Sequence, residues 1–161
     1  MALRYFDAIC RTLKRKLAMA KAHRNLVLYD GVCGFCDRTV QFLLKIDTAN
    51  VLSFAALQGE TAANIASNHH LKLNAEMPET ILFVENFQTA DENVFEKSTA
   101  AIKILFAIGG KWKVLGGLMS IVPNALRDRI YVWFATHRYQ WFGKFDSCQL
   151  PSPEVREKFL E

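Results

Sequence analysis

Long apolar segments are absent from this sequence of 161 residues. The longest stretch without Lys, Arg, Asp or Glu runs from Val114 to Leu126, thirteen residues that two glycines and a proline interrupt. A helix that crosses a bilayer needs about 20 apolar residues, so we expect no transmembrane segment. The first residues also lack the continuous apolar block of a secretory signal, because charged residues interrupt them from Arg4 onward. We therefore predict a cytoplasmic protein.

Cysteine is scarce as well, with four residues in the chain. This number is too small for the disulfide-dense scaffold of a small secreted protein. Cys33 and Cys36 form a single C-x-x-C pair, whereas Cys10 and Cys148 lie far from it in the sequence. The pair is therefore the feature that a functional hypothesis has to explain.

Basic charge is scarce outside the N-terminus. Residues 1–24 carry a net charge of +6, whereas the whole chain carries +4, so the remaining 137 residues sum to −2. A nucleic-acid-binding domain normally carries its basic charge on the folded body, and we therefore expect no nucleic-acid partner. Apolar residues make up 51% and charged residues 22% of the chain, which is typical of a folded domain.

Hydrophobic periodicity predicts an α/β domain over residues 25–161. A buried strand over 25–30 precedes a helix that begins near Cys33 and ends between Asp47 and Asn50, and a second strand over 51–56 precedes a helix over about 60–70. This order predicts a parallel pair of strands. A third strand over 80–84 and an antiparallel partner around 94–95 follow.

The C-terminal part of the domain is predicted to be helical. We expect a helix over 100–108 capped by Ser98 or Thr99, a short helical piece between two glycine pairs, and a long helix from Pro123 to about Phe142. One face of the long helix gathers apolar and aromatic residues, which we expect to cover the sheet; an exposed position beside the cysteines would instead make them a landing surface for a protein substrate. These residues are Leu126, Ile130, Trp133, Phe134, His137 and Trp141.

Residues 1–24 form a separate N-terminal unit, in which a basic amphipathic helix is predicted over 2–22. Three interpretations stay open: a helix docked on the body, a helix on a membrane surface, and an organelle-targeting peptide. Docking is the simplest of the three, and contact of residues 1–22 with an anionic membrane surface is the alternative that the basic residues favour.

The C-x-x-C pair lies where the first strand hands over to a helix. The first turn of a helix presents unpaired backbone N–H groups, which stabilise a thiolate at Cys33 and lower its pKa. Cys36 follows one turn later and can close a disulfide with Cys33. We predict that Cys33 attacks a disulfide and that Cys36 then resolves the mixed intermediate. No cofactor is needed, because the electrons reside in the cysteine pair.

Two other interpretations of the pair remain: half of a zinc site, or two structural cysteines. A zinc site needs further ligands, and the nearest candidates are His69, His70 and Cys148. Adjacent histidines on a helix point in different directions and make a poor ligand pair, so we expect no metal.

The segment Tyr-Asp-Gly-Val-Cys-Gly-Phe-Cys-Asp resembles the signature of the DCC family of thiol-disulfide oxidoreductases, which has an Asp-x-x-Cys-x-x-Cys motif at Asp30, Cys33 and Cys36. Later segments are similar in the same order, so that the resemblance covers about residues 25–160. It implies a thioredoxin-like fold, a mixed sheet with flanking helices and extra C-terminal helices. It also implies a thiol or disulfide substrate, which we expect to be a protein.

The resemblance further implies that Gly34, Phe35, Pro78 and Thr80 contact the substrate. Thioredoxin-like proteins place a cis-proline directly before a Thr and a strand, whereas Pro78 here lies one residue earlier. Asp30 is either a proton acceptor for Cys36 with a pKa raised by burial, or a turn residue that binds backbone N–H groups.

Five other residues have less specific interpretations. Arg38 is expected on a solvated helix face. His137, Arg138 and Tyr139 either reach a substrate or belong to an ordinary packed or surface helix, and Cys148 is either a third redox partner or a buried thiol.

Overall fold

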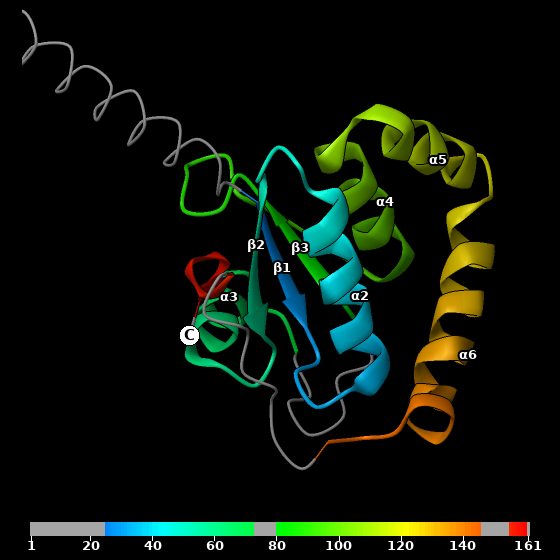
Figure 1. Ribbon diagram of the computed structural model, residues 1–161, viewed down its shortest axis with the longest axis horizontal. Helices are drawn as coiled ribbons and strands as arrows, with labels where there is room; N and C mark the ends of the chain where they lie inside the picture. Colours follow the sequence, from blue (N-terminus) through cyan, green and yellow to red (C-terminus); the bar gives the residue numbers. More distant parts are fainter. Residues whose placement is uncertain (1–24, 73–79, 146–154, 161) are drawn as a thin grey trace, which may run out of the picture.

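The computed structural model describes residues 25–72, 80–145 and 155–160, and its core is a five-stranded sheet with the order β4-β3-β1-β2-β5 (Figure 1). The strands are β1 (Asn25–Tyr29), β2 (Leu52–Ala56), β3 (Leu82–Glu85), β4 (Asn93–Glu96) and β5 (Phe159–Leu160). The helices are α2 (Gly34–Ile46), α3 (Glu60–Asn68), α4 (Lys97–Ile108), α5 (Gly110–Ser120) and α6 (Asn124–Phe142), with a short 3₁₀ turn η1 at Arg156–Lys158.

The strand directions are those of a thioredoxin-like fold. β1 and β2 are parallel, as the strand–helix–strand order predicts, and β3 and β4 complete the sheet in antiparallel pairings. β5 adds a short parallel strand beside β2, which the sequence analysis did not identify. Two residues with no periodicity of their own could not reveal a strand whose partner lies about 100 positions earlier.

The strands bury side chains on both faces of the sheet, because successive residues of a strand point in opposite directions. Val27, Phe54 and Phe83 pack against α2 and α4 on one face. Leu28 and Val84 pack against α3 on the other face. The continuous apolar run of β1 reflects this burial on both sides.

The prediction that Ser98 or Thr99 caps α4 is wrong. The helix begins at Lys97, so Ser98 lies inside its first turn. Asp128 of α6 accepts hydrogen bonds from both the backbone N–H and the hydroxyl of Ser98. The carboxylate of a distant helix therefore does the work that the sequence analysis assigned to a local side chain.

Two further expectations about the C-terminal helices need correction. α5 continues through Gly116 and Gly117 instead of ending there, and Gly116 packs closely against Leu105 and Phe106 of α4. The apolar face expected to cover the sheet is largely exposed: Leu126, Ile130, Trp133 and Trp141 are each about half accessible to solvent. The helix is apolar or aromatic on several sides, and periodicity alone cannot choose which side packs inward.

The opposite side of α6 packs inward, where Ala135 and Arg138 are buried.

Among the described residues, no helix is long and apolar enough to span a membrane. The predicted helix over 2–22, Cys10, Pro78 and Cys148 lie outside the described residues. The division into residues 1–24 and 25–161 therefore stays a prediction.

Candidate active site

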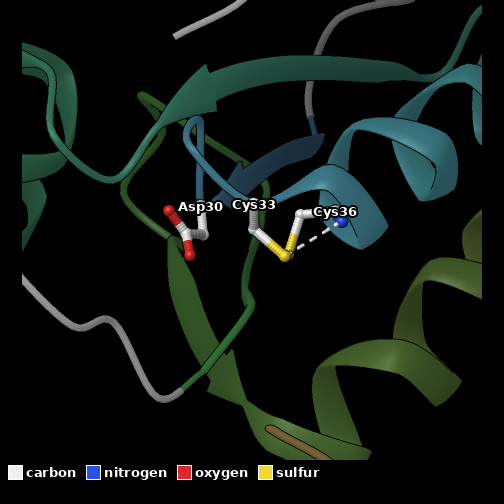
Figure 2. Close-up of side chains that lie close together, drawn as sticks. All are labelled: Asp30, Cys33 and Cys36. Atoms are coloured by element: carbon white, nitrogen blue, oxygen red, sulfur yellow. Dashed lines mark hydrogen bonds between the residues drawn. The ribbon is translucent and has the colours of Figure 1, made fainter. Parts of the chain in front are cut away.

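The two cysteines lie at the start of α2, directly after β1 and its turn. Cys33 is the N-cap residue of the helix, and Cys36 follows in the first turn. The backbone N–H of Cys36 donates to Cys33 Sγ at 3.3 Å. Figure 2 shows Cys33 between Cys36 and Asp30, whose nearest ligand atoms all lie within 4.8 Å of one another. The pair is in the dithiol form.

The surroundings of the pair separate the two thiols strongly. A hydrogen bond from the Cys36 thiol is the largest influence on Cys33; together with the Cys36 N–H and the Arg138 charge it outweighs burial and lowers the pKa of Cys33 to about 6. The same hydrogen bond, with burial, raises the pKa of Cys36 well above its usual range. The pair therefore holds a thiolate on Cys33 and a proton on Cys36, which is the direction that the helix-start position predicts for Cys33.

Access favours the opposite cysteine. The Cys33 side chain is fully buried, whereas Cys36 is partly exposed. Residues 143–145, directly after α6, run antiparallel to residues 32–34: Phe145 N–H donates to the Val32 carbonyl at 2.8 Å. Cys33 therefore has the lower pKa but the lower access, and a substrate can reach its sulfur only if neighbouring residues move.

Gly34 lies against the backbone at the end of α6, and its N–H donates to the Gly143 carbonyl at 3.4 Å. A Cβ on Gly34 would come within 2.5 Å of the Phe142 carbonyl oxygen, closer than any side chain tolerates. The close approach of the end of α6 to the start of α2 therefore requires glycine at this position. This gives Gly34 a packing role in addition to the substrate contact that the resemblance implies.

Asp30 is buried at the end of β1 and satisfied on both carboxylate oxygens. One oxygen accepts from Gln58 Nε2 at 2.9 Å and from the Val32 N–H at 3.3 Å. The other accepts from Arg138 Nη2 at 2.9 Å and from the Tyr139 hydroxyl. The bond to Val32 is the turn interaction that the sequence analysis offered as one alternative, and the buried ion pair was not foreseen.

Arg138 and Tyr139 reach this site from the end of α6, more than 100 residues away from Asp30 in the sequence. Burial lowers the pKa of Arg138, but the bond to Asp30 and the nearby thiolate outweigh it and raise the pKa above its usual value. Burial and the bond to Asp30 raise the pKa of Tyr139 to about 12. The guanidinium thus stays charged and favours a thiolate on either cysteine. The sequence analysis left open whether these two residues reach a substrate or belong to an ordinary packed helix.

A cavity of about 290 Å³ opens beside Cys36. Most of the exposed surface of its lining is apolar. The lining residues that carry polar groups are Asp30, Cys36, Thr39, Thr80, Arg138 and two tyrosines. Phe35 and Phe134 meet in this wall with ring centroids 4.7 Å apart. The structure therefore brings Phe35 and Thr80 of the expected substrate contacts to one cavity. Pro78 lies outside the described residues.

The remaining candidates from the sequence analysis are Arg38 and the residues of a possible zinc site. Arg38 is exposed on α2, as expected. His69 pairs with Glu92 at 2.8 Å rather than approaching the cysteines. Asp30, Cys33 and Cys36 are close enough to share a metal ion, but Arg138 places a buried positive charge on the carboxylate, which opposes a divalent cation.

Comparison with known proteins agrees with this geometry. Residues 27–144 match the model of the DCC1-like thiol-disulfide oxidoreductase family. The chain is 38% identical over 136 residues to the uncharacterized protein YuxK of Bacillus subtilis, covering 84% of this chain and 93% of YuxK. It is 31% identical over 130 residues to a chloroplastic DCC family protein of Arabidopsis thaliana, covering 79% and 70% of the two chains. No solved structure matches. The chain therefore belongs to the DCC1-like thiol-disulfide oxidoreductase family.

Proposed function

We propose that this protein is an enzyme that exchanges disulfides through Cys33 and Cys36. One observation carries the proposal: Cys33 caps α2 and accepts the Cys36 N–H at 3.3 Å, and within this single helical turn the Cys33 pKa is lowered to about 6 while the Cys36 pKa is raised. A thiolate beside a proton-bearing thiol is the arrangement that disulfide exchange requires. Two structural cysteines would need no such separation.

The exchange proceeds in two balanced steps. The Cys33 thiolate attacks one sulfur of a substrate disulfide, forms a mixed disulfide and releases the other sulfur as a thiolate. Cys36 then loses its proton and attacks Cys33 Sγ, which releases the second substrate thiolate and leaves a Cys33–Cys36 disulfide. The substrate is reduced by two electrons and the cysteine pair is oxidised. An external dithiol returns the pair to its starting form, or the cycle runs in reverse.

Asp30 has two roles open to it in the second step. Its carboxylate lies within 4.8 Å of both sulfurs and can accept the Cys36 proton if Tyr139 or Arg138 releases one oxygen. Its four hydrogen-bond donors equally support a purely structural role that holds α6 against the dithiol. Removing the carboxylate charge separates the two: Asp30→Asn slows release of the mixed disulfide by about 10- to 100-fold if Asp30 moves the proton. An unchanged rate with a lower melting temperature assigns Asp30 to structure.

The apolar cavity beside Cys36 supports an apolar substrate group next to the reacting sulfur. Phe35 and Thr80 line it and are the proposed substrate contacts. This lining fits an apolar side chain of a protein substrate better than a small charged thiol. A protein substrate, a cytoplasmic site of action and contact of residues 1–22 with a membrane surface all remain proposals.

The proposal is tested by titrating thiols and mapping disulfides in the full chain. A disulfide substrate in slight excess should produce one intramolecular disulfide between Cys33 and Cys36, and a dithiol should reverse it. Cys33→Ser should abolish turnover, while Cys36→Ser should trap a mixed disulfide on Cys33. A trapped adduct on Cys36 instead would reverse the two roles. Zinc release on acid treatment, with no disulfide formed, would favour a metal-holding module.

A further inference from the structure

The basic residues of the folded body are concentrated in its helical C-terminal half. Residues 97–144, which span α4 to α6, contain eight Lys or Arg and one acid, Asp128, so that their net charge is +7. The net charge of residues 25–161 is only −2, because residues 25–96 carry −7 and offset the +7 of residues 97–144. Arg138 is buried against Asp30, and Lys103 pairs with Glu85. The exposed basic residues of this half are Lys111, Lys113, Arg129 and Lys144, which lie outside residues 1–24.

The same half carries most of the exposed apolar side chains. Of thirteen large apolar residues that are exposed in the described part of the chain, ten lie on α5, α6 or the turn between them. We call these ten residues the α5–α6 apolar face: Val114, Leu115, Leu118, Met119, Ile121, Val122, Leu126, Ile130, Trp133 and Trp141. Figure 1 shows both helices at the outer edge of the molecule, on the side away from α3.

We propose that the α5–α6 apolar face binds an anionic membrane surface. Exposed basic residues border it, with Lys111 and Lys113 on α5, Arg129 on α6 and Lys144 after it. The single acid of this segment, Asp128, accepts hydrogen bonds from Ser98 at the start of α4. Apolar side chains mixed with an excess of basic ones are the chemistry that enters the headgroup region of anionic lipid.

Charge argues against covering of the α5–α6 apolar face by residues 1–24 or by a second copy of the chain. Residues 1–24 carry +6, and a second copy bound through this same face would bring its own +7 segment, so that like charges would face each other in both arrangements. Nucleic acid would match the charge but not the aliphatic side chains, since Leu118 and Ile121 are 60% and 76% exposed and offer nothing to a phosphate or a base. An acidic protein partner is the remaining alternative, and the test below includes it.

The apolar face continues directly to the dithiol. Trp133 and Trp141 lie 5.4 Å apart between ring centroids, Trp141 lies 5.7 Å from Phe134, and Phe134 contacts Phe35 between the two cysteines. Trp side chains at half exposure suit the interface between headgroups and acyl chains. Membrane contact would therefore hold the active site beside the lipid surface. The inference stands on the helices and does not require the dithiol to be active.

The test uses the reduced full-length chain with vesicles of phosphatidylcholine alone or mixed with phosphatidylglycerol. All three tryptophans, Trp112, Trp133 and Trp141, belong to α5 and α6, and residues 1–24 contain none. Quenching of tryptophan fluorescence by lipids with brominated chains therefore reports this face and not the N-terminus. We expect binding to the mixed vesicles, quenching on binding, and loss of both at high salt.

Two variant pairs locate the contact. Lys111→Gln with Lys113→Gln should lower partitioning about 30-fold, since each basic residue near an anionic surface contributes about fivefold. The matched control, Lys45→Gln with Lys72→Gln, removes the same charge from exposed positions in residues 25–96 and should have a much smaller effect. Leu118→Gln with Ile121→Gln, both at exposed positions that leave the core intact, should lower partitioning at least about tenfold.

Several results would overturn the proposal. Absence of vesicle binding would do so, and so would binding without quenching, which would assign membrane contact to residues 1–24. Equal losses of vesicle partitioning in the two double lysine variants would show that net charge, and not this face, determines binding. A change of tryptophan fluorescence with an acidic polypeptide or with single-stranded DNA, and none with vesicles, would show that the face binds a macromolecular partner instead.

Discussion

Replacing Cys36 with alanine should raise the Cys33 pKa, because the Cys36 thiol is the largest cause of its depression. A hydrogen bond to a charged group contributes about 1.5–3 kcal/mol, which corresponds to roughly 1–2 pKa units. The Cys33 pKa should therefore move from about 6 to roughly 7–8. At pH 6.5 the thiolate fraction would fall from about three quarters to between roughly 25% and 3%.

The measurement is a pH titration of thiolate absorbance in a chain whose Cys10 and Cys148 are replaced by serine. This probe does not require access to the sulfur, which matters because Cys33 is buried. Cys36→Ser is the matched control: its hydroxyl keeps a donor near Cys33, so the pKa should rise less than in Cys36→Ala. An unchanged Cys33 pKa in Cys36→Ala would show that the helix N-terminus and Arg138, and not the thiol, hold the thiolate.

Alkylation rates in the same variants measure the access to Cys33 separately. Once Cys33 is fully ionised, its rate constant should remain below that of a small free thiolate, because its side chain is buried. A rate equal to that of a free thiolate would mean that this burial does not restrict access. Faster labelling of Cys36 than of Cys33 in the unmodified chain would contradict the proposed roles.

Three further predictions concern stability. Gly34→Ala should lower the free energy of unfolding by about 1–3 kcal/mol or displace residues 142–145, because the new Cβ meets the Phe142 carbonyl; calorimetry and Cys33 alkylation would show which, and unchanged values would refute the close approach. Arg138→Gln should cost about 3–5 kcal/mol by leaving Asp30 buried without its cation, whereas a loss below 1 kcal/mol on denaturant unfolding would mean that the pair contributes little. The stability of the reduced chain should rise with pH from about 6 towards the usual thiol pKa near 8.5, by at most about 1.4 kcal/mol per pH unit, since only the unfolded chain still binds the Cys33 proton there; Cys33→Ser should lack this slope, and a slope of opposite sign would refute the lowered pKa.

Local patterns in the sequence were sufficient for most of the thioredoxin-like core. β1 and β2 are short buried runs bounded by turn residues, and α2 begins at the cysteine pair as the change of period predicts. The position of Cys33 at a helix start already implied a lowered pKa, because the unpaired N–H groups of a first turn are a property of every helix. These inferences depend on neighbours within a few residues, and a sequence displays such neighbours directly.

Only the tertiary structure decided what surrounds the dithiol. Arg138 and Tyr139 meet Asp30 across more than 100 residues, and the end of α6 lies against the start of α2 because Gly34 lets the two backbones approach. The inward side of α6 was likewise undetermined, since aromatic residues occur around the helix and only its packing against α2 and α4 selects Ala135 and Arg138 for burial. Side-chain periodicity describes one element at a time, whereas burial and ion pairing depend on which elements meet.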